Sequence, residues 1–534
     1  MNSLAHDRAL KVEVLTWCLA AIFAAAGGYL AASGDIAFVA VVIGAFAGAF
    51  LLFKPSVSLW FVIIGGLVLA GVTQLYIPQF QFIRWSIGLL AAILGSIAVL
   101  DYLFRDAPPG HDNLPPIFWW MVAFIGVALI SSALNYRDLG TFVYGFKGYF
   151  QVWGLFFAIV MMSWQKETVD RLPKVLIWIA LIQLPFALHQ YFFLVPARVH
   201  LGGGIVAEDV IAGTFGADAA GGGANAALSV LLIIAAAILT SLYKRKLLSP
   251  YRLLVCVLIL LAPIFLNANR IALLYLILAY LMLFSREIFR HPAKAIVAGA
   301  FSAAVIVAIF WSYAVLLSRS DPSLDWQGFI AKTVEQNTAE DYGYGAYELN
   351  RRTAIVFWLE EHRNRGLAEI LLGHGVGAAR EGEGGVVGAR PLAQREYAGL
   401  GIGLTTVSAM LWEVGVIGLA VLLCILWTAY RAAGRLARVH SDVPWRSAVF
   451  QGLQVGVAIF TVSLFHKRLL IFHLPYQTLF VLVLGYIGYW QVRAGERSVS
   501  VDAPVDASPV IRKLLADTDR ARAARVTRYV PERR

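Results

Sequence analysis

The chain is a succession of apolar segments, each about as long as a helix that crosses a lipid bilayer. Such a helix needs roughly 20 predominantly apolar residues, because the hydrocarbon core is about 30 Å thick and each residue advances the helix by about 1.5 Å. About 14 segments meet this length rule, with a range of about 12–16 because the sixth is short and the ninth and tenth nearly touch. They lie near residues 13–32, 35–53, 57–76, 82–104, 116–134, 148–164, 173–195, 224–243, 251–268, 270–285, 295–317, 404–429, 446–464 and 470–491.

The composition agrees with this pattern. Charged residues make up 14% of the 534 residues and hydrophobic residues 59%, whereas an average soluble domain carries about 25% charged residues. A water-soluble core does not absorb this much apolar surface, so the sequence predicts an all-α, polytopic integral membrane protein. The three cysteines, Cys18, Cys256 and Cys424, lie inside apolar runs without metal-ligand spacing. We therefore expect neither a disulfide nor thiol chemistry.

The distribution of Lys and Arg predicts which loops face the cytoplasm, because short cytoplasmic loops are enriched in these residues. If the N-terminus is inside, the inside loops carry several groups of basic residues: Lys166, Arg171 and Lys174; Lys244, Arg245, Lys246 and Arg252; Arg286, Arg290 and Lys294; and Arg431, Arg435, Arg438 and Arg446. The short outside loops hold only Arg84, Arg137, Lys147, Arg198, Arg270, Lys467 and Arg468. The net charge of +11 thus suits topology and anionic lipid rather than nucleic acid.

This topology divides the chain into four parts. Residues 1–317 form the first eleven spans, and residues 318–403 form one large periplasmic loop. Residues 404–491 form three further spans, and residues 492–534 form a basic tail. Both termini are predicted to be cytoplasmic. The first apolar run lacks a clear signal-peptidase site and is followed by further spans, so we expect it to remain as an anchor.

The large loop combines a helical stretch with a glycine-rich one. The helical stretch has apolar residues spaced to bury one side of a helix: Leu349, Ile355, Val356, Leu359 and Leu367. The second stretch contains Gly-His-Gly-Val-Gly at 373–377, followed by Arg380. Glycine-rich backbone beside basic side chains binds phosphate through its N–H groups in many proteins. The alternative is a flexible re-entry into the membrane.

Polar breaks between apolar runs supply further candidates. Arg270 follows Asn267-Ala268-Asn269 with no room for a loop, and an arginine at the membrane boundary costs a few kcal/mol unless it snorkels or is paired. It therefore either reaches the headgroups or holds an anionic group in a lateral cavity. Arg351 and Arg352 are either exposed charges of the loop helix or part of the same site. The Gly- and Asn-rich break at 211–225 is a candidate re-entrant turn.

Four motifs occur in order over roughly residues 205–430: Gly213-Thr214-Phe215 with Asn225; Asn269-Arg270 before an apolar run; Arg351/Arg352 with Phe357-Trp358 and Gly373, Gly375 and Gly377; and Leu411–Leu419 with Glu413. In these motifs and their external placement, the chain resembles the superfamily of O-antigen ligases and Wzy-type polysaccharide polymerases of bacterial envelopes. The resemblance implies a ligase-like architecture, similar to that of GT-C glycosyltransferases.

One departure from the family pattern bears on the activity. In the ligases a His-Asn pair usually opens the span that carries the glutamate motif, and its histidine is thought to be catalytic. This chain has Leu404, Thr405 and Thr406 there, which favours a polymerase over a ligase. His374 and His362, in the same loop, are candidate substitutes.

The resemblance implies polymerisation of lipid-linked repeat units of O-antigen, capsule or exopolysaccharide. The donor is a glycan on undecaprenyl pyrophosphate, on the outer side of the bacterial cytoplasmic membrane, and no cofactor is expected. The candidate catalytic residues are His374, Arg270, Arg351 and Arg352, and the candidate substrate-binding residues are Arg198, Arg380, Asn225 and Glu413. Arginines suit a pyrophosphate because they bind phosphate oxygens bidentately. His374 is our first choice of general base and Glu413 the second.

No metal site is predicted, since the loop has neither an Asp-x-Asp pair nor a His/Cys cluster. The expected partners are the lipid-linked oligosaccharide, membrane lipids and a chain-length regulator, and no nucleic acid.

Two other functions remain open from the sequence. One is an O-antigen ligase that transfers glycan to lipid A-core. The other is a secondary transporter or lipid-glycan flippase. Transporters usually place ionisable groups at mid-membrane and show inverted repeats. Here the interiors of the spans carry almost no charge, with Glu413 as the main exception.

Overall fold

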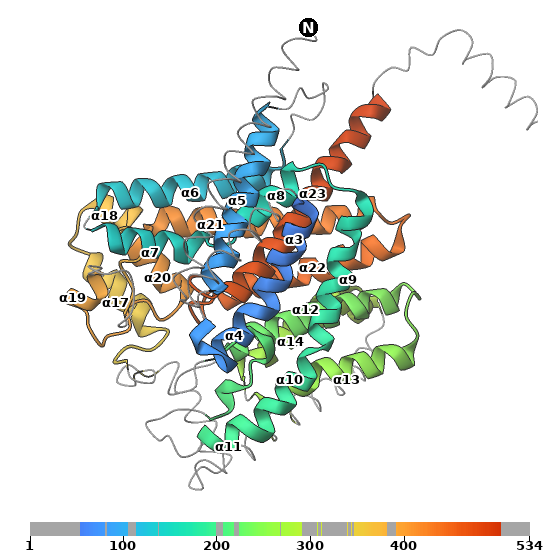
Figure 1. Cartoon of the computed structure of the whole chain (residues 1–534), viewed down its shortest axis with the longest axis horizontal. Coiled ribbons are helices and arrows are strands. Elements are labelled where there is room, and N and C mark those ends of the chain that lie inside the picture. The colour runs from blue at the N-terminus through green and yellow to red at the C-terminus, as the bar shows by residue number, and fades with distance from the viewer. Residues whose placement is uncertain are drawn as a thin grey trace, which may run out of the picture.

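The computed structural model describes residues 54–80, 83–104, 114–136, 138–198, 207–217, 224–267, 269–290, 347–381 and 391–502, together with four isolated positions between 291 and 346. Throughout these ranges the regular elements are helices, and there are no strands. The predicted all-α class is confirmed for this part of the chain (Figure 1).

Six helical stretches are long and apolar enough to cross a membrane. They are Pro55–Tyr76 (α3, η1 and α4), Pro78–Phe104 (η2 and α5), Pro116–Leu134 (α6), Lys166–Arg198 (α9, α10, η3 and α11), Asn225–Lys244 (α12) and Gly415–Val439 (α21). A seventh is obtained if α7 (Leu139–Phe150) and α8 (Trp153–Met161), inclined at 46°, count as one span. The protein thus has the helices of a membrane protein. The count of 14 stays a prediction, because the candidate spans 13–32, 35–53 and 295–317 lie outside the described residues.

The other helices are shorter or less apolar: α13 (Pro250–Leu266), α14 (Ile271–Arg290), α17 (Thr353–His362), α18 (Leu367–Leu372), α19 (Leu392–Glu396), α20 (Thr406–Glu413), α22 (Pro444–Ser463) and α23 (Leu474–Asp502). Helix α23 runs through the predicted boundary at residue 491, and the rest of the tail lies outside the described residues.

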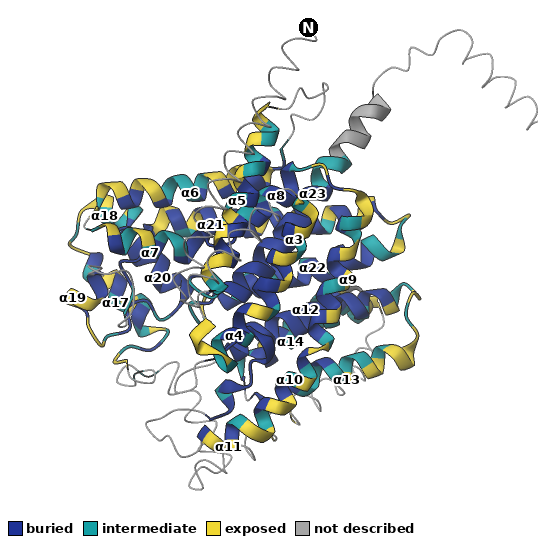
Figure 2. Ribbon diagram, viewed as in Figure 1, coloured by how far each residue is buried: buried dark blue, intermediate teal, exposed yellow. Residues whose placement is uncertain are grey.

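Helix α12 forms the centre of the bundle. In its most apolar window 83% of the residues are buried, against 33–56% in the other five candidate spans. It packs against α13, α14 and α22, and Figure 2 shows the buried residues concentrated in this region. The helices of the large loop, α17 to α19, gather instead at one end of α6, α7 and α21 (Figure 1).

Two helix caps fix the backbone near this end. Asp138 begins α7, and its Oδ1 accepts the N–H of Thr141 at 2.6 Å. Thr405 begins α20, where its hydroxyl accepts the N–H of Ser408 and the Ser408 hydroxyl accepts the N–H of Thr405, both at 3.0 Å. Such caps satisfy N–H groups that the first turn of a helix leaves without partners.

The predicted loop helix exists as α17, but its predicted buried face is wrong. Leu359 and Leu367 are 57% and 75% exposed, and Val356 is exposed as well. The buried residues of α17 are Ala354, Trp358 and His362. The apolar pattern misleads here because the interior contact is made by aromatic and histidine rings. In a membrane protein, moreover, exposed leucines are not confined to the core, since lipid tails are as apolar as leucine.

Candidate functional site

The glycine-rich segment, residues 373–380, is packed into the protein. Residues 373–379 are all buried. The N–H of His374 donates to the carbonyl of Trp412 at 2.8 Å, and the N–H of Gly375 donates to the carbonyl of Glu413 at 2.9 Å. The expectation of a flexible re-entry at this point is therefore wrong, because the backbone is fixed against the end of α20.

The helices that contact the glycine-rich segment have glycines where their backbones approach the backbone of residues 371–376. A Cβ on Gly145 of α7 would lie 2.4 Å from the carbonyl carbon of Val376. Gly415, at the break between α20 and α21, has φ +66°, and a Cβ there would lie 2.4 Å from the carbonyl carbon of Leu371. Any side chain at these positions would separate the segment from the helices.

The N–H groups of the segment already have acceptors. The N–H of Ala379 donates to Oε1 of Glu413 at 3.1 Å. Glu413 is fully buried. The N–H groups of Gly375 and Ala379 are both bound by Glu413 and are therefore not available to a phosphate.

Basic side chains gather beside the segment, around the rings of Tyr144 and Phe472. The guanidinium carbon of Arg380 lies 3.7 Å from the centroid of the Tyr144 ring. Arg468 lies 5.3 Å from the Phe472 ring and donates to the carbonyl of Ala379 at 3.0 Å. These contacts engage π faces and carbonyl oxygens, and neither guanidinium forms an ion pair among the described residues.

Four further cations adjoin these two. Arg84 donates to the carbonyl of Phe472 at 3.4 Å, and Nζ of Lys147 lies 3.0 Å from the centroid of the Trp85 ring. Nε of Arg351 donates to the carbonyl of His466 at 2.7 Å, next to Lys467. We call the six residues the cationic cluster: Arg84, Lys147, Arg351, Arg380, Lys467 and Arg468.

The members of the cationic cluster affect one another and their neighbours. Burial lowers the pKa of Arg380, and the positive charge of Arg468 lowers it further. Burial, then Arg351 and Lys467, hold the pKa of His466 well below its ordinary value. His466 is therefore neutral at physiological pH, and its ring adds no positive charge of its own.

Acidic partners are scarce at this end. Within the described part of the chain, Arg84, Lys147, Arg380, Lys467 and Arg468 form no ion pair. The carboxyl groups of Glu413 and Glu381 interact electrostatically with Arg468, and both also bind backbone N–H groups. Oε1 of Glu381 accepts the N–H of Gly401 at 2.8 Å.

The other end of the bundle differs. Arg446, in the first turn of α22, makes two hydrogen bonds to Asp170, of 2.7 and 3.1 Å. Lys244, at the end of α12, lies 2.8 Å from Glu287. Lys467 and Arg468 follow the last residue of α22. With 20 residues, α22 separates the two ends by about 30 Å.

Two histidines of the large loop lie side by side in an aromatic enclosure. Nε2 of His374 is 3.0 Å from Nε2 of His362, and the rings of Trp358 and Trp412 pack against the pair. Nδ1 of His362 lies 2.9 Å from the carbonyl of Trp358 and must donate to it. Nε2 of His362 is then the acceptor and Nε2–H of His374 the donor. Burial lowers the pKa of His362, which favours this neutral arrangement.

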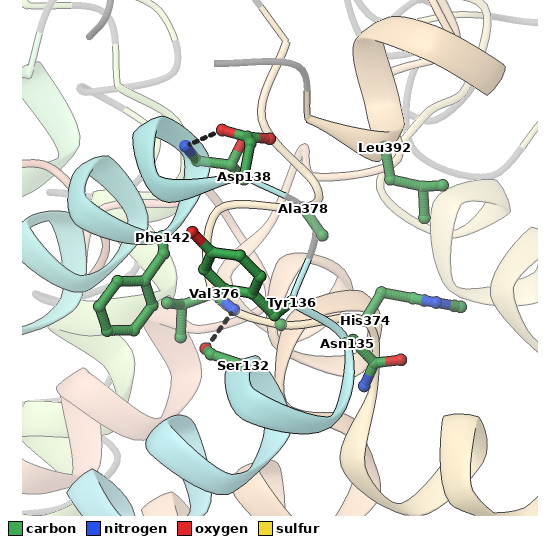
Figure 3. Close-up of a pocket in the computed structure, with 11 residues that line it drawn as sticks. Ser132, Asn135, Tyr136, Asp138, Phe142, His374, Val376, Ala378 and Leu392 are labelled. Atoms are coloured by element: carbon green, nitrogen blue, oxygen red, sulfur yellow. Dashed lines mark hydrogen bonds between the residues drawn. The ribbon is translucent and has the colours of Figure 1, made fainter. Parts of the chain in front are cut away.

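A small, open pocket adjoins the histidine pair on the side of α6 and α7 (Figure 3). It is lined by Ser132, Asn135, Tyr136, Asp138, Thr141, Phe142, His374, Gly375, Val376, Ala378 and Leu392. Ala378 precedes Arg380 by two residues, and Phe142 precedes Tyr144 by two. None of the six cationic-cluster residues lines the pocket itself.

The structure places the remaining candidates elsewhere. The side-chain amide of Asn225 donates to Asp209 at 2.8 Å and to the carbonyl of Asn267 at 3.2 Å. Asn269 belongs to the same polar network and immediately precedes the partly buried Arg270. The candidates Asn225 and Arg270 thus meet at the starts of α12 and α14.

Three candidate arginines differ in position. Arg198 is buried at the end of α11, near Glu208. Arg352 is exposed at the start of α17. Arg351 lies near enough to Tyr275, in the second turn of α14, to interact with it electrostatically. Arg351 is thus the member of the cationic cluster that lies near α14, the helix that follows Arg270.

Four members of the cationic cluster were not among the residues predicted from the sequence: Arg84, Lys147, Lys467 and Arg468. The sequence does distinguish these four residues, since they make up most of the few basic residues in the short loops that are predicted to be external. No family model matches the chain, and no curated protein matches it. The argument for function therefore depends on the site.

Proposed function

We propose that the protein is a membrane glycosyltransferase that polymerises lipid-linked polysaccharide repeat units. The donor is a glycan on undecaprenyl pyrophosphate, and the reaction takes place on the outer side of a bacterial cytoplasmic membrane. The observation that carries the proposal is the cationic cluster, in which five cations lie together without an ion pair among the described residues. A site of this kind favours a multiply charged anion.

The chemistry of the donor explains why cations are needed. Transfer breaks the bond between the anomeric carbon and the pyrophosphate oxygen, and the hydroxyl of the acceptor sugar forms the new glycosidic bond. Negative charge develops on the departing diphosphate, so fixed cations stabilise the transition state more than the ground state. Arg380 and Arg468 present guanidinium groups suited to phosphate oxygens, and Lys467 adds positive charge.

The acceptor hydroxyl must lose its proton, and His374 is the proposed base. Its ring lines the pocket on the side of α6 and α7. In the tautomer with hydrogen on Nε2, which the contact with His362 favours, the basic lone pair is on Nδ1. A positioned base contributes about 10²–10⁴-fold to such a reaction.

The test replaces the cations in the organism that makes the protein. Arg380→Ala and Arg468→Ala are expected to abolish long polymer while lipid-linked repeat units accumulate. Arg435→Ala, which removes an exposed arginine of α21 far from the cluster, is the matched control and should leave chain length unchanged. Normal chain length in both cluster variants, at wild-type protein levels, would refute the proposal.

The same experiment separates the ligase alternative. A ligase uses the same lipid-linked donor, so the cationic cluster suits it equally. In a ligase-deficient variant, however, long glycan would remain on undecaprenyl pyrophosphate and would be absent from lipid A-core. The chain length of the lipid-linked glycan therefore distinguishes the two activities.

A further inference from the structure

Glu413 makes the contacts that fix the glycine-rich segment. Its Oε1 accepts the N–H of Ala379 at 3.1 Å, and its backbone carbonyl accepts the N–H of Gly375 at 2.9 Å. One residue thus binds the segment at two positions, four residues apart.

The segment in turn presents two arginines of the cationic cluster. The carbonyl of Ala379, whose N–H is bound by Glu413, accepts the hydrogen bond of Arg468 at 3.0 Å. The next residue is Arg380, whose guanidinium lies on the face of Tyr144 at 3.7 Å. A displacement of the Ala379 backbone would move the acceptor of one guanidinium and the attachment point of the other.

We infer that Glu413 is a positioning residue that sets the separation of Arg380 and Arg468. Its carboxyl group is fully buried and does not touch the substrate. The inference rests on the proposed function for the identity of the anion, which is the diphosphate of the donor. It assigns Glu413 a role other than substrate binding or proton transfer.

The length and the acceptor oxygens of the Glu413 side chain suit this role. Its Oε1 accepts a buried N–H group, and the carboxyl group lies near Arg468, which binds the same residue of the segment. Glutamine would keep one acceptor oxygen in place of two, and alanine would lose both.

The experiment uses the full chain in lipid nanodiscs and two independent readouts. Hydrogen exchange of the backbone over residues 375–381 reports whether the segment is held. Titration with inorganic pyrophosphate reports whether the cations are arranged for a diphosphate. The variants are Glu413→Gln, Glu413→Ala and Arg380→Ala, each confirmed as folded by size-exclusion chromatography.

Glu413→Ala is expected to accelerate exchange of the segment and to weaken pyrophosphate binding, each by about tenfold or more. Glu413→Gln should give intermediate values for both, and it provides the test if the alanine variant does not fold. Arg380→Ala should weaken binding while exchange stays as in the wild type, because Glu413 still holds the segment.

Two results would overturn the inference. In one, exchange of the segment is unchanged in the Glu413 variants. In the other, exchange accelerates while pyrophosphate binding stays at the wild-type level. Failure of the proposed function gives a different result, in which the wild type itself does not bind pyrophosphate or Arg380→Ala binds as well as the wild type.

Discussion

Arg380→Ala tests the cationic cluster at a member whose guanidinium has few internal contacts. In the part of the chain that the structure describes, the guanidinium of Arg380 contacts the Tyr144 ring at 3.7 Å and donates no hydrogen bond. Its removal therefore breaks only a cation–π contact, worth about 0.5–1 kcal/mol at a partly exposed site. We expect the free energy of unfolding to fall by no more than about 1 kcal/mol.

The effect on ligand binding should be larger. A hydrogen bond to a charged group contributes about 1.5–3 kcal/mol, and each 1.36 kcal/mol is a factor of about ten. Arg380→Ala should therefore weaken binding of undecaprenyl pyrophosphate by roughly 10- to 150-fold. Arg380→Lys keeps the charge but loses the planar fork, so its affinity should lie between those of the alanine variant and the wild type.

The assay is a titration of nanodisc-reconstituted protein with undecaprenyl pyrophosphate at two salt concentrations. Affinity should fall with salt, since exposed charges are screened over about 10 Å at 0.1 M. Arg435→Ala is the control for loss of one positive charge. An affinity of Arg380→Ala within about twofold of the wild type, in a protein of unchanged stability, would contradict the reasoning, because every estimate above exceeds that change.

Three further predictions concern stability. Hydrogen bonds from Arg365 and Tyr397 lower the pKa of Glu361. The stabilisation of the fold by this carboxylate is therefore complete above the unfolded-state pKa of about 4.3 and is lost as the pH falls through the folded-state pKa. Glu361→Gln should lower the melting temperature at pH 7, and the melting temperatures of variant and wild type should converge on acidification. Asp170→Asn, at the paired end of the bundle, should lower the free energy of unfolding by about 1–3 kcal/mol in a detergent titration without altering pyrophosphate binding. Gly145→Ala would place a Cβ 2.4 Å from the Val376 carbonyl carbon and should cost about 1–3 kcal/mol, whereas Gly126→Ala, which meets no atom within 4 Å, should be neutral.

The sequence predicts helix positions well where an apolar run ends at a polar or helix-breaking residue. The predicted span 116–134 matches α6, and 224–243 is displaced by one residue from α12. The predicted span 404–429 is instead two helices, α20 and α21, with a break at Val414. Hydropathy cannot show this break, because it depends on the positive φ of Gly415 and on the contact of that residue with Leu371.

The site was less predictable, because it is assembled from several loops. Arg351 and Arg380 were predicted from their place in the large loop, but Arg84 and Arg468 belong to short loops that no sequence pattern brings together. Glu413 was predicted as a substrate-binding residue or second-choice base because it belongs to the glutamate motif of the family resemblance. Its hydrogen bond to Ala379 shows instead that its carboxyl group holds the glycine-rich segment.

The position of the cationic cluster also separates a transferase from a transporter. If the loops that carry these residues are external, as the sequence predicts, they oppose the usual charge distribution of membrane proteins, so topology does not account for them. A transporter of an anionic substrate needs its cations in a cavity that opens to both sides. Arg446, in the first turn of α22, is paired with Asp170, whereas the cluster residues Lys467 and Arg468 lie beyond the last residue of this helix. A transferase needs fixed cations only on the side where the lipid-linked donor binds, so a cluster at one end of α22 suits the proposed reaction better than transport.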